Sequence, residues 1–508
     1  MTLEQAPHTT SVRTYGHLVG GAWVETETSI DRHNPATGQL VARFADGSAI
    51  DVDRAVATAR TAFDDGRWSG LASSDRARLL LAWAAALRDN AEMLAQMEAS
   101  EVGKPIRMAR GDIEGAIGLT EYAAALAFDI HGEAYDRVNG GDLAMVLREP
   151  VGVVAAIVPW NFPALIYAQK VPFALAAGCT VIVKPSELTS GTALEMTRLA
   201  HEVGVPTDVL NAVTGYGAKV GQRISEHADV DMISFTGSTA TGRAIATAPS
   251  PNHKRLSFEL GGKGSTIVFD DADLDDAVDG VLFGAYLNQG ETCCAGSRLI
   301  IQDTIANEFV GRLSRRAAAL KVGDIFDDGT DIGAMIHEAH LDKVLDYIEA
   351  GQASGATVVT GGQRLLDDGR KGGLFVAPTI LDYVDPGASV FQEEIFGPVL
   401  ATARFSTVAE AIELANNTVY GLANGVWTKN VDRAVEVGRA LRSGTVWINT
   451  ANDGAPQLPF GGYKDSGSGR EKGRPGLEEF LENKTFHIHV GARTPYFDSE
   501  GVAATEVA

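Results

Sequence analysis

The sequence predicts an α/β protein of at least two domains, built on mostly parallel sheets that are covered by helices. The chain has 508 residues, too many for one hydrophobic core, and this length indicates domains of about 100–250 residues each. Short apolar segments alternate with helical segments, which is typical of parallel sheets. The 56 glycines indicate many tight corners between strands and helices.

Helices are predicted first, over residues 50–130. The segments VDRAVATARTAFDD and SDRARLLLAWAAALRDNAEMLAQMEASE repeat apolar residues at spacings of three and four, as one face of a helix requires. Ser74 and Asp75 are predicted to cap the second of these helices. No repeat of 20–50 residues is evident, so a solenoid is not expected.

Buried strands are predicted further along the chain, each leading into a polar turn or a helix. The first covers Gly152 to Val158 and ends in the proline-bounded turn PWNFP. A helix follows it, and the same order of strand, turn and helix then recurs. The other predicted strands begin the segments TVIVKPSE, VDMISFTGSTATGRAIATA, STIVFDDADLDDAV and RLIIQDTI, and one more lies in SGTVWINT.

Composition limits the compartment and the partners. The net charge of −23 disfavours nucleic acid and anionic membranes as partners. The longest apolar run, around Val151 to Trp160, is about half of the ~20 residues that a membrane helix needs. The N-terminus lacks the apolar core of a secretion signal. Three cysteines form neither a disulfide framework nor the paired spacing of a zinc site. We therefore expect a cytoplasmic protein without a metal.

Two of the three cysteines, Cys293 and Cys294, stand side by side in the glycine-rich segment NQGETCCAGSR. In a reducing compartment both are thiols, and one of them is a candidate nucleophile. A free thiol is only about 3% ionised at pH 7, so the site has to activate it. A nearby base, backbone dipoles or a cationic cofactor ring are the candidate sources of that activation.

The segment FTGSTATG predicts a phosphate site. A strand leads to Gly237, where the backbone can approach a ligand closely. Ser238 and Thr239 can cap the following helix and leave free N–H groups at its positive end. The segment is not the G-x-G-x-x-G fingerprint, and an ordinary capped corner would have the same sequence. Taken alone, the motif leaves both interpretations open.

Four further segments carry polar residues at predicted strand ends or glycine turns. Each alone is compatible with a solvated turn, but together with FTGSTATG they predict one site, because ligands collect at the carboxyl ends of parallel strands. These residues are Asn161 in PWNFP, Lys184 and Glu187 in KPSE, Glu259 in FELGGKG, and Glu393 and Glu394 in EEIFGPV.

The ordered set PWNFP, KPSE, FTGSTATG, ELGGK, the cysteine loop, EEIFGPV and PFGGYKDSGSGRE resembles the aldehyde dehydrogenase superfamily, in its NAD(P)-dependent group that does not use CoA. The resemblance runs from about Gly20 to Lys484. It implies two parallel-sheet, Rossmann-type domains: a NAD-binding domain (1–129 and 151–261) and a catalytic domain (262–470). It also implies a bridging β-element (130–150 and 484–495) that joins subunits into a homodimer or homotetramer.

The resemblance also assigns the chemistry, which is oxidation of an aldehyde to its acid with NAD⁺ and water. Cys293 matches the nucleophile, Asn161 a donor to the oxyanion, and Glu259 the base that activates water. One oxyanion donor contributes ~3–4 kcal/mol. Lys170 and Glu471 match a deeper pair that is either a proton relay or a structural salt bridge.

The resemblance implies NAD as the cofactor and disfavours NADP. Glu187 matches a carboxylate that accepts a hydrogen bond from the adenosine ribose 2′-hydroxyl, with Lys184 beside it. A 2′-phosphate facing that carboxylate would cost about 1–4 kcal/mol, although a rotated Glu187 would admit some NADP. The cofactor-binding set is Val158, Pro159, Trp160, Lys184, Glu187, Phe235, Gly237, Ser238, Gly242, Leu260, Glu394 and Phe396.

The matched substrate-tunnel positions lack Trp, Tyr and Phe, so an aromatic cage for a quaternary ammonium is not expected. Arginine is also absent from them. We therefore predict a roomy, neutral tunnel for a fairly bulky or apolar aldehyde, unless other side chains fill the space. The positions are Ala164, Leu165, Ile166, Gln169, Thr292, Asn452, Asp453 and Gly454, with Gly115 and Ala116 near the entrance.

Three other functions remain open from the sequence. A CoA-acylating relative would need no water-activating base, so Glu259 weighs against it. A thiol esterase would need neither FTGSTATG nor KPSE. A non-catalytic binding protein would not need every matched catalytic position to be present, as it is here.

Overall fold

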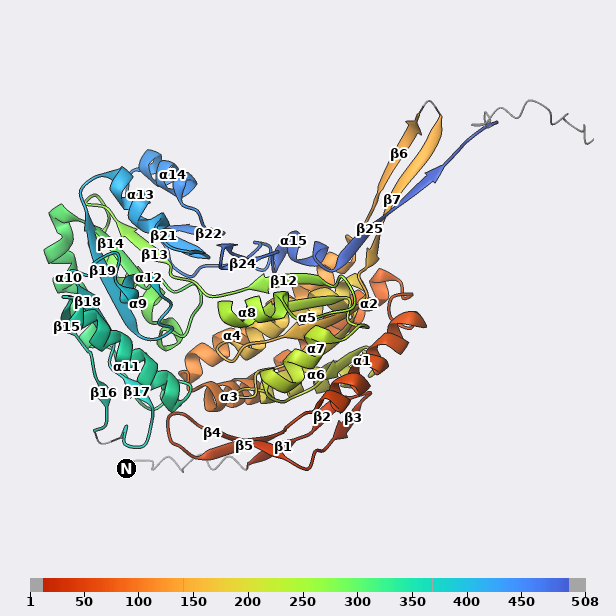
Figure 1. Ribbon diagram of the computed structural model, residues 1–508, viewed down its shortest axis with the longest axis horizontal. Coiled ribbons are helices and arrows are strands. Elements are labelled where there is room, and N and C mark those ends of the chain that lie inside the picture. The colour runs from red at the N-terminus through yellow and green to blue at the C-terminus, as the bar shows by residue number, and fades with distance from the viewer. Residues whose placement is uncertain (1–11, 140, 368, 493–508) are drawn as a thin grey trace, which may run out of the picture.

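The computed structural model describes residues 12–139, 141–367 and 369–492. The chain forms two lobes side by side, and a narrow arm projects from one of them (Figure 1). One lobe contains an eight-stranded sheet and the other a seven-stranded sheet. Both sheets are largely parallel and carry helices, which confirms the predicted α/β class.

Five parallel strands form the centre of the eight-stranded sheet, whose order is β24-β12-β11-β8-β9-β10-β2-β3. Every residue of β8, β9 and β11 is buried, as expected for strands with helices on both faces. The strands are β2 (His17–Val19), β3 (Ala22–Val24), β8 (Val153–Ile157), β9 (Thr180–Lys184), β10 (Leu210–Ala212), β11 (Met232–Thr236), β12 (Arg255–Glu259) and β24 (Gly467–Ser468).

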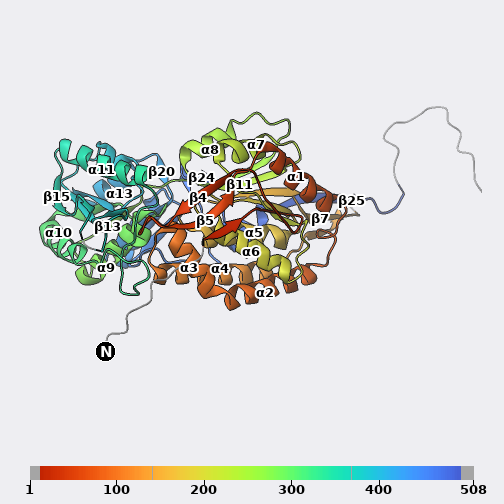
Figure 2. The same ribbon diagram turned by 90° about the horizontal axis from the view of Figure 1, so that it is seen from below.

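Helices cover both faces of this sheet. Figure 2 shows α1, α7 and α8 on one side and α2, α3, α4 and α6 on the other. None of the helices in the described part of the chain is both long and apolar enough to span a bilayer. The helices of this lobe are α1 (Ala49–Asp64), α2 (Ser73–Asp89), α3 (Ala91–Val102), α4 (Ile106–Ala127), α5 (Pro163–Ala177), α6 (Gly191–Glu202), α7 (Gln222–Glu226) and α8 (Thr239–Ala246), with a π-turn at Gly217–Gly221.

The predicted N-cap of α2 is wrong. The cap position is Ala72, which makes no side-chain capping bond, and Ser74 and Asp75 lie inside the first turn. The Asp75 N–H donates to the Ala72 carbonyl over 2.9 Å, so the helix begins before the pair predicted to cap it. The Asp75 carboxylate still favours the helix, because a negative charge in the first turn opposes the positive end of the helix dipole.

The seven-stranded sheet has the order β15-β18-β19-β14-β13-β21-β22, and β15 alone is antiparallel to its neighbour. Its strands are β13 (Ser265–Val268), β14 (Arg298–Gln302), β15 (Thr357–Thr360), β18 (Thr379–Asp382), β19 (Val399–Phe405), β21 (Ala423–Trp427) and β22 (Thr445–Ile448). Its helices are α9 (Leu274–Tyr286), α10 (Asp303–Ala318), α11 (Glu338–Ala353), α12 (Ser389–Gln392), α13 (Val408–Asn416) and α14 (Val431–Ala440), with a 3₁₀ turn at Leu287–Gly290.

Shorter elements complete the lobes. A three-stranded sheet runs along the outside of the first lobe, two small two-stranded sheets lie in the rest of the chain, and helix α15 leads toward the arm (Figure 1). These elements are β1 (Arg13–Tyr15), β4 (Ser29–His33) and β5 (Leu40–Ala45), then β16 (Arg364–Leu365) with β17 (Phe375–Val376), β20 (Tyr420–Gly421) with β23 (Tyr463–Lys464), and α15 (Gly473–Glu478).

The arm is a three-stranded antiparallel sheet of order β25-β7-β6, made of β6 (Glu133–Val138), β7 (Asp142–Pro150) and β25 (Leu481–Ile488). In β25 only Leu481 is buried. The strand begins three residues before the predicted start at 484. Residues 493–495 of that predicted element lie outside the described residues.

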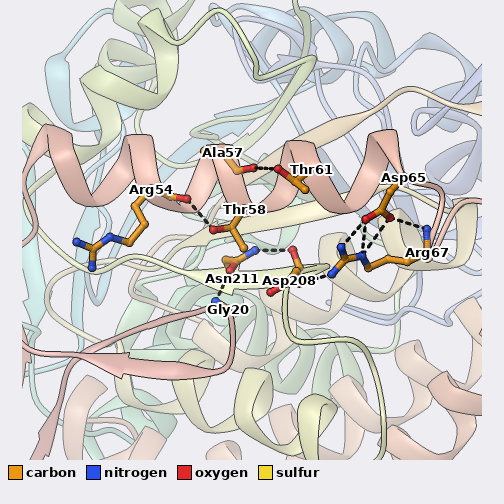
Figure 3. Close-up of polar contacts among 9 residues, drawn as sticks. All are labelled: Gly20, Arg54, Ala57, Thr58, Thr61, Asp65, Arg67, Asp208 and Asn211. Carbon is orange, nitrogen blue, oxygen red and sulfur yellow. Dashed lines mark hydrogen bonds and ion pairs between the residues drawn. The ribbon is translucent and has the colours of Figure 1, made fainter.

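The hairpin of β2 and β3 is fastened to the first sheet by side chains in β10 and just before it (Figure 3). Asn211 accepts from the Gly20 N–H over 2.9 Å and donates to the Asp208 carbonyl over 2.9 Å. Arg67, just after α1, pairs with Asp65 and Asp208. These contacts join the N-terminal hairpin, α1 and the sheet edge on the side away from the strand ends that carry the site.

Candidate active site

The two cysteines lie in a tightly folded loop between α9 and β14. Three successive residues before them, Asn288, Gln289 and Gly290, have φ angles of 54°, 58° and 75°, in the left-handed region that non-glycine residues seldom adopt. All three are buried. A strained segment of this kind persists only where its surroundings fix it, and it delivers the following residues to the junction of the two lobes.

Asn161, at the end of β8, binds directly to this loop. Its side-chain amide donates to the Glu291 carbonyl over 2.9 Å, and its own carbonyl accepts from the Asn288 side chain over 3.1 Å. Asn161 is 3% exposed. The structure therefore brings the predicted oxyanion donor and the cysteine loop together, although they are separated by some 130 positions in the sequence.

The two thiols face different surroundings. Cys294 donates to the Asn452 side-chain oxygen over 3.6 Å and lines a cavity of about 10 Å³ with Trp447 and Asn452. Contact with Cys294, burial and the charges of Glu394 and Glu259 raise the pKa of Cys293, while the same contact lowers the pKa of Cys294. Acidity alone would favour Cys294. Position favours Cys293, because Glu259 and Glu394 act on it.

Glu259 is the last residue of β12 and is almost completely buried. Neither of its carboxylate oxygens has a hydrogen-bond partner among the described residues. Burial and then the charge of Glu471 raise its pKa well above the usual value. An unpaired buried carboxylate of raised pKa suits a general base.

Lys170 and Glu471 form a buried ion pair next to Glu259. The Lys170 ammonium also donates to the Ser234 hydroxyl over 3.1 Å, and the Thr236 hydroxyl donates to Glu471 over 3.4 Å. One Glu471 oxygen has no partner among the described residues. The pair is thus in place for either predicted role, proton relay or structural salt bridge.

A cavity of about 840 Å³ opens at the carboxyl ends of β8, β9 and β11. Eight of the predicted cofactor residues line it, which fits the expectation that ligands of parallel sheets bind at these ends. The eight are Val158, Pro159, Trp160, Lys184, Glu187, Phe235, Gly237 and Ser238.

Four other predicted cofactor residues are not among the cavity lining. Gly242 packs against Leu260, whose side chain would lie 2.7 Å from a β-carbon added at 242. Glu394 accepts from the Gly262 N–H over 2.9 Å, and burial raises its pKa to about 7. Phe396, at φ 61°, stands edge-on to Trp160 with ring centroids 5.3 Å apart. Phe396 and Trp160 together link the cavity to the catalytic lobe.

The residues around this cavity fit a dinucleotide. Ser238 caps α8 by accepting from the Thr241 N–H over 3.1 Å, as the sequence predicted for one of its two candidates. The Thr239 hydroxyl is buried at the same helix terminus without a partner among the described residues. Gly237 donates its N–H to the Glu259 carbonyl, so phosphate donors would come from the helix terminus itself.

Lys184 and Glu187 form a 3.3 Å ion pair at the cavity. Lys184 is buried, and burial lowers its pKa. Glu187 is more exposed than Lys184, so its carboxylate is available to a ligand. The pairing places a hydrogen-bond acceptor and a cation side by side, as the sequence predicted.

The predicted tunnel positions differ in exposure. Ala164 and Ala116 are buried in the core and therefore do not line an open space. A β-carbon at Gly115 would lie 2.8 Å from the Leu165 side chain, so Leu165 fills the room left by that glycine. Asp453 and Gly454 are exposed. Neighbouring side chains therefore fill the space at three of the predicted positions, Ala164, Ala116 and Gly115.

Sequence reasoning missed three residues of this region: Glu291, His340 and Lys472. The His340 Nε2–H donates to the Phe396 carbonyl over 2.7 Å, and the His340 ring lies 5.7 Å from that of Trp160. Glu291 stands between the noted segments NQG and CC, and Lys472 directly follows Glu471. Adjacency to matched residues was the one signal that could have identified Glu291 and Lys472.

Comparison with known proteins assigns the family. The profile of the aldehyde dehydrogenase family matches residues 23–486. Betaine aldehyde dehydrogenase of Bacillus subtilis is 41% identical over 93% of this chain and 96% of its own. The NADP/NAD-dependent aldehyde dehydrogenase PuuC of Escherichia coli is 43% identical over 94% and 95%.

Comparison with solved structures leads to the same family. The NAD-dependent aldehyde dehydrogenase from Sinorhizobium meliloti is 45% identical, has a TM-score of 0.93 and matches 95% of this chain and 96% of its own. Betaine aldehyde dehydrogenase from Staphylococcus aureus, in complex with NAD⁺, is 38% identical with a TM-score of 0.94 over 96% and 97%. The chain belongs to the aldehyde dehydrogenase family and is an oxidoreductase acting on aldehydes.

Proposed function

We propose that the protein oxidises an aldehyde to its carboxylic acid with NAD⁺, through a covalent adduct on Cys293. The reaction is RCHO + NAD⁺ + H₂O giving RCOO⁻ + NADH + 2H⁺. The observation that carries the proposal is that the Asn161 amide binds the cysteine loop, while the unpaired carboxylate of Glu259 lies within electrostatic range of Cys293.

In the first half of the reaction, Cys293 attacks the aldehyde carbon as a thiolate. Because its pKa is raised in the free protein, the thiol has to be activated, and backbone dipoles and the cationic ring of a bound NAD⁺ would favour release of its proton to solvent. The oxyanion of the thiohemiacetal binds the Asn161 amide and the backbone N–H of Cys293. When bound, NAD⁺ accepts the hydride that leaves the adduct carbon, and Cys293 then carries a thioester.

In the second half, Glu259 takes a proton from water, and the hydroxide attacks the thioester carbonyl. The carbon–sulfur bond breaks, the acid leaves, and the Cys293 thiolate is regenerated. A carboxylate without hydrogen-bond partners can orient a water toward that carbon. The proton then leaves through Glu471 and Lys170, or, if that pair is only structural, directly to solvent.

NAD is the proposed cofactor, with NADP disfavoured. Lys184 and Glu187 would hold the adenosine ribose, Glu394 the nicotinamide ribose, and the α8 terminus the pyrophosphate. Glu187 supports the preference because its carboxylate would repel a 2′-phosphate. The name of the Escherichia coli relative includes both cofactors, so a strict preference is not assumed.

Assembly and location are also proposals. The arm supports a homodimer or homotetramer: it exposes Leu147, Phe486 and Ile488 on strands that project from the body (Figure 1), and exposed apolar strands of this kind favour pairing. We propose the predicted division into domains as well, with the arm as the bridging element. A reducing, cytoplasmic location is supported by the three thiols, which are all free.

The test is NADH formation with a panel of aldehydes, with and without CoA, in the wild type and in Cys293→Ala. Acid as the product and no effect of CoA are expected. Formation of an acyl-CoA would favour the CoA-acylating alternative, for which no structural observation speaks at present. Ester hydrolysis without any NADH formation would point to a thiol esterase and contradict the proposal.

A further inference from the structure

Lys472 is a cation at the active site that the proposed chemistry does not use. It follows Glu471 directly and adopts φ 59°, so its side chain leaves the backbone in a different direction from the buried ion pair of its neighbour. Phe460 and Glu471 exchange two backbone hydrogen bonds of 2.7 Å. This pairing holds the start of α15, and with it Lys472, against the segment that leads to the predicted tunnel.

The Lys472 ammonium lacks a polar partner. In the part of the chain that the structure describes, no carboxylate lies within ion-pair distance and no acceptor within hydrogen-bond distance of it. The ammonium stands over the Phe460 ring, 5.4 Å from the centroid. Lys104, Lys170 and Lys184, which are also buried in this half of the molecule, all have carboxylate partners.

The space in front of this ammonium is open. A β-carbon added at Gly454 would meet only one atom within 4 Å, the Lys472 nitrogen at 3.5 Å. Gly454 is exposed and is one of the predicted tunnel positions. Lys263, the other buried lysine whose nitrogen lacks a partner among the described residues, is enclosed, whereas Lys472 is half-buried. A ligand can therefore reach Lys472 across Gly454.

The same ammonium acts on the reacting end of the site. Burial lowers its pKa, and Cys294, Glu471 and Glu259 raise it, so it lies within electrostatic range of the thiol loop and the base. Asp453, the nearest predicted tunnel acid in sequence, is bound instead by the Thr450 hydroxyl. The positive charge is thus left for a group that the protein itself does not supply.

We propose that Lys472 is a specificity-determining residue that binds an anionic group on the substrate, so that the aldehydes oxidised best carry a carboxylate or similar anion at the end remote from the carbonyl. This inference rests on the proposed function. A charge-assisted hydrogen bond to a half-buried ammonium is stronger than one between neutral groups and is screened less by salt than one on the open surface.

The inference revises the predicted tunnel. The matched positions are neutral or small, and an uncharged aldehyde was therefore expected from the sequence. Lys472 lies outside that set because it follows the segment PFGGYKDSGSGRE in the sequence. Its ammonium comes close to Gly454 only in the folded chain. The small residues, Gly454 above all, then provide access to the cation as well as room for an apolar chain.

The experiment compares hexanal with 6-oxohexanoate, two aldehydes of equal chain length that differ in the terminal carboxylate. The measured quantity is the ratio of kcat/KM for the anion to kcat/KM for the neutral aldehyde, from NADH formation. We expect a ratio well above one in the wild type. Lys472→Met should lower it by roughly tenfold, mainly through KM of the anion, and Lys472→Arg should restore most of it.

Lys429→Met is the matched control, because Lys429 is an exposed lysine that pairs with Asp273, and its ratio should equal that of the wild type. Thermal unfolding of each variant checks that the fold is kept. A wild-type ratio at or below one, or an equal loss for both aldehydes in Lys472→Met, would overturn the inference and leave the proposed function standing. Absence of NADH with every aldehyde would overturn both.

Discussion

Two buried glutamates at the candidate active site, Glu291 and Glu259, differ in their hydrogen-bond partners. This difference distinguishes a residue that supports a loop from one that can take part in the reaction. Both are almost completely buried and both have a raised pKa, to about 8 for Glu291. Glu291 accepts from the Ile336 N–H over 3.0 Å and from the Gln289 side chain over 3.2 Å. Glu259 accepts from no described residue.

The comparison teaches that burial and a shifted pKa do not by themselves identify a catalytic acid. A carboxylate whose oxygens are occupied by protein donors fixes the loop that contains it. One whose oxygens are free can bind water or substrate protons. Glu291 therefore supports the left-handed segment before Cys293, and Glu259 is left for the reaction. The predictions below test this difference, from the largest expected effect to the smallest.

Loss of the proposed nucleophile should show the largest effect. Cys293→Ala should abolish NADH formation, because no adduct can form, while Cys294→Ala should keep a substantial fraction of the wild-type rate. Steady-state assays at one saturating aldehyde concentration measure both. If Cys294→Ala were as inactive as Cys293→Ala, with its fold intact by circular dichroism, the assignment of Cys293 would be wrong. The lower pKa of Cys294 would then identify the nucleophile better than position does.

Glu259→Gln should slow turnover by about 10²–10⁴-fold, with the loss in deacylation. Hydride leaves before water is needed, so rapid mixing should show a burst of NADH near one equivalent per active site. A mutant with no burst and no trapped thioester would mean that Glu259 serves mainly to deprotonate the thiol. Its stability should stay close to the wild type, since no hydrogen bond of the protein is lost.

Glu291→Ala should instead destabilise the fold, by about 1–3 kcal/mol, because the Ile336 N–H would be buried without an acceptor. Urea unfolding, with the midpoint compared at constant slope, measures the change. The comparison fails if Glu259→Gln proves as destabilising as Glu291→Ala.

Glu187 is an intermediate case, a carboxylate with one lysine partner in an open cavity. Glu187→Gln should raise kcat/KM for NADP by roughly tenfold, or ~1.4 kcal/mol, and lower it for NAD by less. The measurement is kcat/KM for both cofactors in both proteins at one fixed aldehyde concentration. An unchanged ratio, or a wild type that already prefers NADP, would remove Glu187 as the determinant of cofactor choice.

The last prediction concerns the slope of stability against pH. The pKa of Glu291 is raised by burial from 4.5 to about 8, so between these values the folded state holds a proton that the unfolded state has released. Its contribution to stability is complete below the unfolded pKa and is lost as pH rises toward 8. Glu291→Gln should therefore weaken the fall of stability with rising pH, by at most about 1.4 kcal/mol per pH unit.

Local patterns predicted the strands and the helices well, because apolar runs and glycine turns alternate over neighbouring residues and can be recognised in the sequence directly. The strand ending at Val158 and the strand beginning VDMISF form β8 and β11 side by side. The cap of α2 was misplaced, because the cap position is Ala72, whose side chain cannot cap, while Ser74 and Asp75, the favoured residue types, lie inside the first turn. Only the backbone geometry shows where the chain enters the helix.

The site was predictable as far as motifs at strand ends could be matched to the family. What the sequence could not supply were contacts between distant segments. Glu291 gains its role from Ile336, and Lys472 from Gly454. Ala164 and Ala116 were expected near the tunnel but lie in the core, since sequence position does not tell which side of a helix faces the cavity.

The arm is connected to the site by short, stiff stretches of chain. Strand β7 ends at Pro150 and leads through β8 to Asn161, while β25 begins at Leu481, ten residues after Glu471. The two strands that join the arm to the body therefore lead, within about ten residues of chain, to the predicted oxyanion donor in one case and to the ion pair beside the predicted base in the other.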